Sequence, residues 1–378
     1  MSEIAFSLAT RDDDAGIRHL LATSAMPGRI RVRFEREPDY FAGCASMGSF
    51  TQVLVAKDED RVVGVACRAV QRMFVNGVAE DVGYLGQLRV DAAYRGRLLV
   101  ARGFRRLREL HADGRVRGYI TTIVGGNAEA EGVLVHRARG TMPRYRFLDK
   151  LFTLAIPIPR RTGRRTTCHP ERVAGGREGS PAEARHSPRR PGILRAPTTP
   201  PAQDDRLSGA AKTSLESFLA EHGPTRNLAP ASEPHGELVA VEGGVAVLDD
   251  QRAYKQTVID GYAPALRIAR PLYNLVGRIR LPKPGAMLNH AYVTRFCVAN
   301  DDERVAACLI EELLAVAASH GLDHILLGFT ERDPLLRIAR KFRPVEYESS
   351  VYTVAWNGED DLHDRLDSRP RALDLSAL

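Results

Sequence analysis

The sequence lacks any run of 18 consecutive apolar residues, which excludes a membrane-spanning helix. Its first residues, MSEIAFSLATRDDD, lack the basic and apolar regions of a signal peptide and are acidic by residue 12. We therefore expect a cytoplasmic protein without a membrane partner. The 44% of apolar and 27% of charged residues are typical of globular domains, and a chain of 378 residues suggests two of them.

Patterns of metal and dinucleotide sites are also missing. The five cysteines are odd in number and never spaced as CxxC, and no HExxH or similar histidine spacing occurs. The absence of these spacings argues against a disulfide framework and a zinc site, so we expect no bound metal. No GxGxxG follows a strand-like segment, which excludes the dinucleotide-binding fold. The scattered cysteines are Cys44, Cys67, Cys168, Cys297 and Cys308.

The net charge of +7 is concentrated in one segment. Residues 160–195 hold ten arginines and three glutamates, a net of +7, so the rest of the chain sums to about zero. The surrounding stretch, residues 160–206, is rich in Pro, Gly, Arg and Ser and cannot bury enough apolar surface to offset its ordering entropy. We expect a disordered linker or insertion there, with weak attraction to polyanions and no specific nucleic-acid recognition.

This linker separates two patterned zones. We expect a first domain at residues 1–159, a second at residues 207–357 and a polar tail at residues 358–378. In the first domain the strand-like and helix-like patterns follow the order β-α-β-β-β-α-β-α-β. One helix lies between two strands that we expect to be parallel, so the predicted fold class is α+β, with a mixed central sheet flanked by helices.

The stretch LRVDAAYRGRLLVARGF, which begins at Leu88, predicts a strand, a short loop and a helix that starts near Leu98. Such a junction presents free backbone N–H groups at the positive end of a helix dipole, which suits a pyrophosphate. Gly96 allows close backbone approach, and Arg95 and Arg97 can add charge-assisted hydrogen bonds. From these residues alone, a loop with merely solvated arginines is an equally good interpretation.

The same stretch resembles the acetyl-CoA motif of the GNAT (general N-acetyltransferase) superfamily, V-x-P-x-x-R/Q-G-x-G-x-G/A between a strand and a helix. The resemblance covers about residues 4–156 in element order and implies acetyl-CoA as cosubstrate. It implies that the backbone of Leu88, Arg89 and Val90 contacts the pantetheine arm. It also implies that the loop and helix start contact the phosphates, through Arg95, Gly96, Arg97, Leu98, Leu99 and Val100.

Other positions fit or depart from the family pattern. The Asn that opens the helix after the next strand falls at Asn127. Leu98 and Val100 replace two loop glycines, and their side chains narrow the space for the phosphates. This predicts reduced or lost affinity for CoA. The tyrosine that often serves as an acid is Leu134 here, and the glutamate that often serves as a base is Gln87, which cannot take a proton.

The catalytic residue therefore stays unknown. Five other side chains are candidates for moving a proton, and each has a plainer interpretation as a strand, helix-surface or turn residue. They are Tyr84, Tyr145, His136, Glu80 and Asp81.

The second domain resembles a degenerate second GNAT-like copy. Residues 291–356 repeat the order strand, helix, strand, helix, strand. At the position of the Arg95 loop they carry Ala299-Asn300-Asp301-Asp302-Glu303, whose carboxylates suit a helix start and repel a pyrophosphate, so we expect no cofactor here. Residues 254–280 predict a helix broken near its prolines, which either lines the acceptor site or packs between the domains.

Two functions from different classes fit these observations. The first is an acyl-CoA-dependent N-acyltransferase that moves an acetyl group to an amine of a small molecule or peptide. The second is a catalytically inactive GNAT-like scaffold that binds a ligand or protein, which Leu98, Val100, Leu134 and Gln87 favour. A nucleic-acid-associated protein that acts through the basic linker is a third and weaker hypothesis.

Overall fold

The computed structural model describes residues 3–26, 28–96, 98–136, 140, 142–159, 217–233, 235–276, 281–359 and 361–378, so the expected linker lies outside the described residues. No helix in these ranges is long and apolar enough to cross a bilayer. The strands are β1 (Ala5–Leu8), β2 (Ile30–Glu35), β3 (Phe50–Asp58), β4 (Arg61–Val75), β5 (Val78–Val90), β6 (Tyr119–Val124), β7 (Arg144–Pro157), β8 (Glu237–Val241), β9 (Gly244–Asp249), β10 (Gln256–Tyr262), β11 (His290–Val298), β12 (His324–Thr330) and β13 (Val345–Ala355). The labelled helices are α1 (Asp14–Ala22), α2 (Tyr40–Ala45), α3 (Leu99–His111), α4 (Ala128–Glu131), α6 (Pro264–Val276), α7 (Glu303–Ser319), α8 (Leu336–Arg340) and α9 (Leu362–Arg365).

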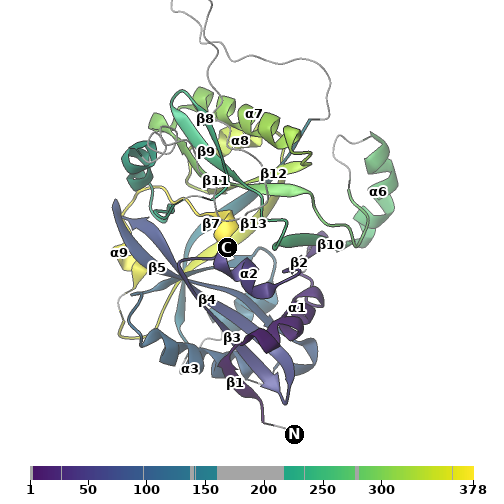
Figure 1. Ribbon diagram of the computed structural model, residues 1–378, viewed down its shortest axis with the longest axis vertical. Helices are drawn as coiled ribbons and strands as arrows, with labels where there is room; N and C mark the ends of the chain where they lie inside the picture. Colours follow the sequence, from purple (N-terminus) through teal and green to yellow (C-terminus); the bar gives the residue numbers. More distant parts are fainter. Residues whose placement is uncertain are drawn as a thin grey trace, which may run out of the picture.

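A continuous mixed sheet of eleven strands runs through the protein, in the order β1-β3-β4-β5-β6-β13-β7-β12-β11-β9-β8 (Figure 1). Two pairs of neighbours, β5 with β6 and β11 with β12, are parallel, and the other pairs are antiparallel. Read from either edge, the sheet therefore begins with antiparallel pairs and then has one parallel pair, as expected for two related halves. A second, two-stranded sheet pairs β2 of the first half with β10 of the second.

The centre of the large sheet joins the two halves by exchanging their last strands. Strand β7 is the last strand of the first half in sequence, yet its second part, residues 151–157, pairs with the whole of β12 of the second half. Strand β13 ends the second half but pairs with β6 of the first, and β7 and β13 also pair with each other. The two expected domains thus share one sheet, and each needs a strand of the other to complete its own part.

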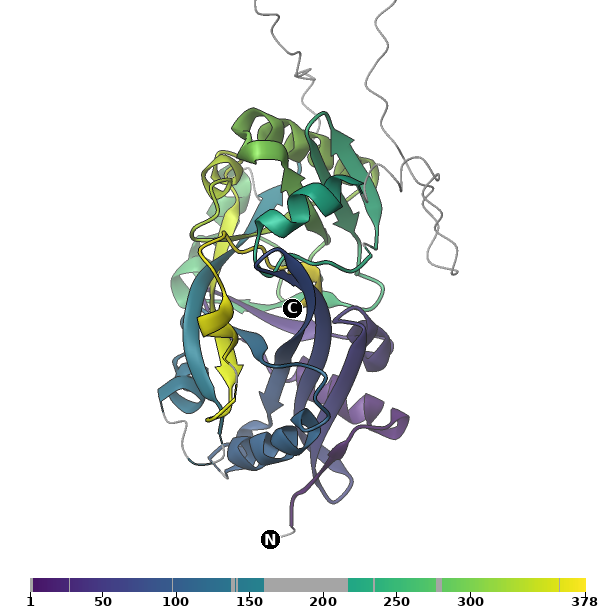
Figure 2. The ribbon, with the colours of Figure 1, turned by 90° about the vertical axis from the view of Figure 1, so that its left-hand side faces the viewer.

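Helices cover both faces of the sheet (Figure 2). Residues of α1 and α2 pack with β3, β4 and β5 into one core, and residues of α3 pack with β5, β6 and β13 into another. In the second half, α7 and α8 cover β9, β11 and β12. Helix α3 follows its sequence pattern, because Phe104 and Leu107 are buried while Arg105 and Arg108 face solvent.

The expectation of one broken helix over residues 254–280 is wrong. The first part of this range forms β10, and α6 then runs through Pro271 without a break. The inner side of α6 packs through Leu266 in a cluster that holds residues of β2 and β10, one strand from each half, whereas its outer apolar side chains are 66–83% exposed. These side chains are Ile268, Leu272 and Leu275.

The expected polar tail, residues 358–378, packs inside the protein. Leu362, Leu373 and Leu375 join the core beneath α1 and α2. The Gln71 side chain donates a hydrogen bond to the Ala377 carbonyl at 2.9 Å, and Lys255 donates to three further carbonyls of the tail. Hydropathy patterns miss this packing because the few apolar residues are separated by charged ones.

Candidate functional site

Strands β5 and β6 pair at two positions only, in the middle of β5 and at the start of β6. The next carbonyl, that of Leu85, accepts a hydrogen bond from the Thr121 hydroxyl at 2.6 Å instead of one from the β6 backbone. Residues 86–90 pair with β4 alone, so in the described structure no strand covers their other edge. An uncovered edge offers backbone N–H and C=O groups to an extended ligand. The paired positions are Gly83 with Tyr119 and Tyr84 with Ile120.

A β-bulge lies where the two strands separate. Gln87 and Leu88 of β5 oppose Ala66 of β4, and Gln87 has a left-handed backbone with φ of 57°. Such a bulge increases local twist and leaves a residue outside the ladder. The Gln87 amide accepts a hydrogen bond from the Tyr40 hydroxyl at 2.7 Å and donates to the Met47 sulfur at 2.8 Å. Gln87 is therefore held by side chains from α2 and the loop after it.

Helix α3 begins without a side-chain cap. Its N-cap residue, Leu98, accepts no hydrogen bond from the first turn with its side chain, and that turn holds no acidic residue. Just before it, Gly96 has φ of 78°, and a Cβ at this position would point into open space. In the part of the chain that the structure describes, no side chain of the N-cap or of the first turn caps the first amides of α3, which can therefore donate to an external anion.

An ion pair crosses from this loop to the helix after β6. The Arg95 guanidinium lies 3.1 Å from the Glu129 carboxylate, and both side chains are more than half exposed. Asn127 caps α4, because its side-chain oxygen accepts a hydrogen bond from the Ala130 amide at 3.1 Å. Arg97 lies outside the described residues.

The bulky residues at the motif's glycine positions differ in their surroundings. Leu98 adopts a left-handed conformation with φ of 57°, and its side chain is 75% exposed at the mouth of the junction. Val100 and Leu88 instead pack into the core beneath α3, and Leu99 packs in a small cluster with Val90. Of these side chains, that of Leu98 is the one exposed at the start of α3.

The side chain of Arg89 lies on the face of β5 opposite to Leu88 and Val90, because side chains alternate along a strand. Burial lowers the pKa of Arg89, whereas nearby Tyr347, Tyr40 and Tyr84 raise it. Burial also raises the pKa of Tyr84 and Tyr347 to about 12, so both hydroxyls stay protonated at neutral pH. The charge of the buried Arg36 is close enough to lower the pKa of Arg89 further.

Among the five candidate proton carriers, Tyr84 lies at the last paired position before β5 and β6 separate. Its ring covers Gly86, where a Cβ would come within 2.6 Å of the ring, so glycine is required there. The Tyr84 hydroxyl is 3.4 Å from the Thr122 hydroxyl. Tyr84 therefore has a titratable hydroxyl and lies where β5 and β6 separate.

The other four candidates have plainer roles. Glu80 accepts hydrogen bonds from Arg365 at 2.5 and 2.6 Å, and Asp81 pairs with Arg72 at 3.2 Å. Tyr145 packs against aromatic rings of the α3 core, and His136 is exposed at the end of a π-helical turn. Leu134, at the position of the family tyrosine, is buried in that core and has no proton to give.

The second half carries the same bulge. Arg295 and Phe296 of β11 oppose Ala246 of β9, and Arg295 has φ of 53°. The bulge begins three residues before the end of β11, as it does in β5. This match between distant segments supports two copies of one fold.

The junction after β11 is closed, unlike the one after β5. The Asp302 carboxylate caps α7 by accepting hydrogen bonds from two amides, at 2.7 and 3.1 Å. The partly buried Arg226 bridges Asp301, at 2.7 Å, and Asp333 beyond β12, at 3.4 Å. The donors that are free at the start of α3 are therefore satisfied at the start of α7, which is consistent with the expectation of no cofactor there.

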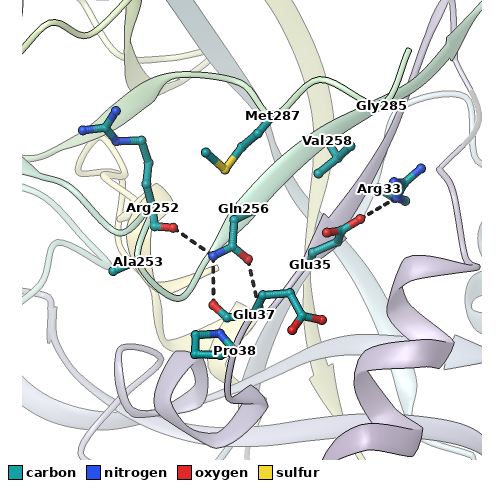
Figure 3. Close-up of a pocket in the computed structure, with 10 residues that line it drawn as sticks. All are labelled: Arg33, Glu35, Glu37, Pro38, Arg252, Ala253, Gln256, Val258, Gly285 and Met287. Atoms are coloured by element: carbon teal, nitrogen blue, oxygen red, sulfur yellow. Dashed lines mark hydrogen bonds and ion pairs between the residues drawn. The ribbon is translucent and has the colours of Figure 1, made fainter.

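A cleft of about 510 Å³ lies beside the small sheet of β2 and β10 (Figure 3). Its polar groups are bound to one another: Gln256 bonds with backbone groups of Glu37 and Arg252, and Arg33 pairs with Glu35. None of the residues predicted from the acetyl-CoA motif lines it. We therefore place the candidate site at the separation of β5 and β6.

Comparisons with known proteins agree with this fold. A probable glucosamine 6-phosphate N-acetyltransferase 2 of Oryza sativa subsp. japonica is 40% identical over 108 residues, which is 27% of this chain and 63% of that protein. The crystal structure of Saccharomyces cerevisiae N-myristoyltransferase with bound myristoyl-CoA matches with a TM-score of 0.57 at 10% identity, over 99% of this chain and 86% of that one. A putative acetyltransferase from Pyrococcus horikoshii matches with a TM-score of 0.46 at 14% identity, over 100% and 96% of the two chains. No protein-family profile matches the sequence.

The bulged strand that leaves its parallel neighbour, followed by a helix, defines the class of this protein as a GNAT-type α+β fold. Because the N-myristoyltransferase structure matches nearly the whole chain, the fold is a tandem one. The protein is a tandem GNAT-fold chain whose halves exchange their closing strands, and the fold class predicted from the sequence is confirmed.

Proposed function

We propose that the chain is an acyl-CoA-dependent N-acyltransferase that transfers an acetyl group to an amine of a small molecule or peptide. The observation that carries the proposal is the continuous path from the uncovered edge of β5, past the bulge at Gln87, to the uncapped start of α3. The partial match to an N-acetyltransferase from rice supports the same reaction class.

In this proposal the pantetheine arm adds to the edge of β5 through the backbone of Leu88, Arg89 and Val90. The pyrophosphate takes hydrogen bonds from the first amides of α3 and from Arg95, with Gly96 allowing close approach. The bulge places the thioester beside the free backbone groups at Gln87, which polarise its carbonyl.

The chemistry is direct attack of an amine on the thioester. A C–N bond forms as the C–S bond breaks, CoA leaves as the thiol by taking a proton from the protein, and the proton lost by the amine replaces the one given up. Tyr84 is our candidate donor of the proton to sulfur, because its raised pKa keeps it protonated. Most of the rate comes from holding the two reactants together.

The second candidate function, an inactive GNAT-like scaffold, is favoured by specific contacts. Glu129 engages Arg95 at the mouth, and the Leu98 side chain stands where the motif has a glycine. Leu134 is buried in the core instead of offering a hydroxyl to the leaving thiolate.

Calorimetric titration with acetyl-CoA separates these functions. The enzyme hypothesis predicts saturable binding that Arg95→Glu weakens by about 1–3 kcal/mol, the scale of a charge-assisted hydrogen bond. Arg105→Glu is the matched control, since it makes the same charge change at an exposed position farther along α3 and should leave the affinity unchanged. A flat titration of the unaltered protein would favour the scaffold.

A further inference from the structure

Arg89 is a partly exposed cation without an acidic partner. A guanidinium has five N–H groups, and the described residues accept one hydrogen bond from Arg89, that of the Leu88 carbonyl at 2.9 Å. The groups that act most on its charge are three tyrosines and Arg36, with no Asp or Glu among them. Most of its donors are therefore free to bind something that the chain itself does not supply.

Arg36 is a second cation, close enough for its charge to act on Arg89. Its side chain is 4% exposed, and its Nε and Nη1 atoms have no hydrogen-bond partner within the described ranges. The Arg36 aliphatic stem packs on Gly43, where a Cβ would come within 2.4 Å of it. Burying a charged group without a partner is costly, so the buried Arg36 calls for a functional reason.

A third donor, the hydroxyl of Tyr347 on β13, faces the same region. This oxygen is buried without a hydrogen-bond partner in the described structure, and Arg89 is the one charged group that acts on its pKa. Tyr347 comes from the second half, and the strand exchange brings β13 beside β6. The three side chains thus come from β5 and the segment before α2 in the first half, and from β13, the exchanged strand of the second half.

We infer that Arg89 and Tyr347, backed by Arg36, bind an anionic group of the acceptor, so that the acceptor amine carries a carboxylate or a phosphate. The inference rests on the proposed function, because Arg89 lies two residues from the bulge where the thioester is placed. An anion held on this face keeps the amine on the side of β5 opposite the α3 core. The charge of the anion also offsets the two unpaired guanidinium groups.

The test is a calorimetric titration of the full chain, saturated with CoA, with inorganic phosphate, with acetate and with ethylammonium chloride. We expect saturable binding of phosphate or acetate in the millimolar range, and none of ethylammonium. Phosphate binding with no acetate binding indicates a phosphorylated acceptor, and the reverse indicates a carboxylate. Saturating CoA keeps the probe anions away from the start of α3.

Three variants assign the binding to this site. Arg89→Leu should weaken it about tenfold to a hundredfold, and Tyr347→Phe, which keeps the ring, by up to about tenfold. Arg72→Leu, an exposed arginine of β4, is the matched control and should bind as the unaltered protein does. Because Tyr347→Phe changes one oxygen, it still reports on the site if Arg89→Leu does not fold.

The outcomes separate this inference from the proposed function. If the chain does not bind CoA but binds the anions with these variant effects, the anion site stands and the transferase proposal fails. If CoA binds but neither anion saturates up to ~50 mM, the anion site is overturned. It is also overturned if Arg89→Leu and Tyr347→Phe, when folded, bind the anions as tightly as Arg72→Leu does.

Discussion

Replacement of Leu98 by glycine tests the junction between β5 and α3 most sharply. Leu98 has φ of 57°, a conformation that costs a residue with a Cβ about 1–2 kcal/mol. Its side chain is 75% exposed, so truncation removes little buried surface. In a helix interior glycine is less stable than alanine by about 0.5–1 kcal/mol, but at this position the order should reverse. Leu98→Gly should be more stable than Leu98→Ala by about 0.5–1 kcal/mol.

Urea unfolding of the two variants measures this difference through their midpoints at equal slope. The acetyl-CoA affinity should be highest for Leu98→Gly, lower for Leu98→Ala and lowest for the unaltered protein. Both changes remove the leucine side chain from the start of α3, and glycine also relaxes the backbone. If Leu98→Ala is as stable as Leu98→Gly, the strain argument fails. If neither change improves CoA binding, Leu98 is no obstacle and its departure from the family pattern has no cost.

Three further predictions concern the rest of the fold. The hydrogen bonds from Arg68 hold the pKa of Asp113 at about 2, well below 3.8, so this pair should contribute about 2 kcal/mol above pH 4 that is lost as the pH falls toward 2. Asp113→Asn should remove that part of the pH dependence of the unfolding free energy, and an unchanged acid profile would contradict it. Arg226→Met should destabilise the protein by about 1–3 kcal/mol in urea, because it leaves the buried carboxylate of Asp333 without its partner, and a loss under about 0.5 kcal/mol would refute this role. Deletion of residues 160–205 should leave the melting temperature and CoA binding unchanged, since the composition of this stretch gives it too few apolar residues to join a core; a collapse in solubility would contradict it.

The local elements around the site could be predicted from the sequence. The strand, loop and helix from Leu88 onward have a regular apolar period, and Asn127 caps its helix as its position suggested. The carboxylates after β11 likewise indicated a junction unlike the one at Arg95. These features depend on neighbours in the chain, which is why the sequence shows them.

The features that depend on distant contacts could not be predicted. The exchange of β7 and β13 is a choice between pairings that the same strand patterns allow equally. Tyr347 is an ordinary strand residue in the sequence, and its approach to Arg89 follows from that exchange. Residues 254–280 were misassigned because apolar residues of a short buried strand also fit a helical period. The left-handed backbone at Gln87 gives no signal, since glutamine does not mark a bulge.

The most direct test of the account is a crystal structure of the chain with bound acetyl-CoA. The account predicts pyrophosphate oxygens within hydrogen-bond distance of the first amides of α3, and the pantetheine arm paired with residues 88–90 of β5. A cofactor bound elsewhere, for example in the cleft beside the small sheet of β2 and β10, would contradict it. A pyrophosphate that the Leu98 side chain keeps away from the start of α3 would also contradict the account.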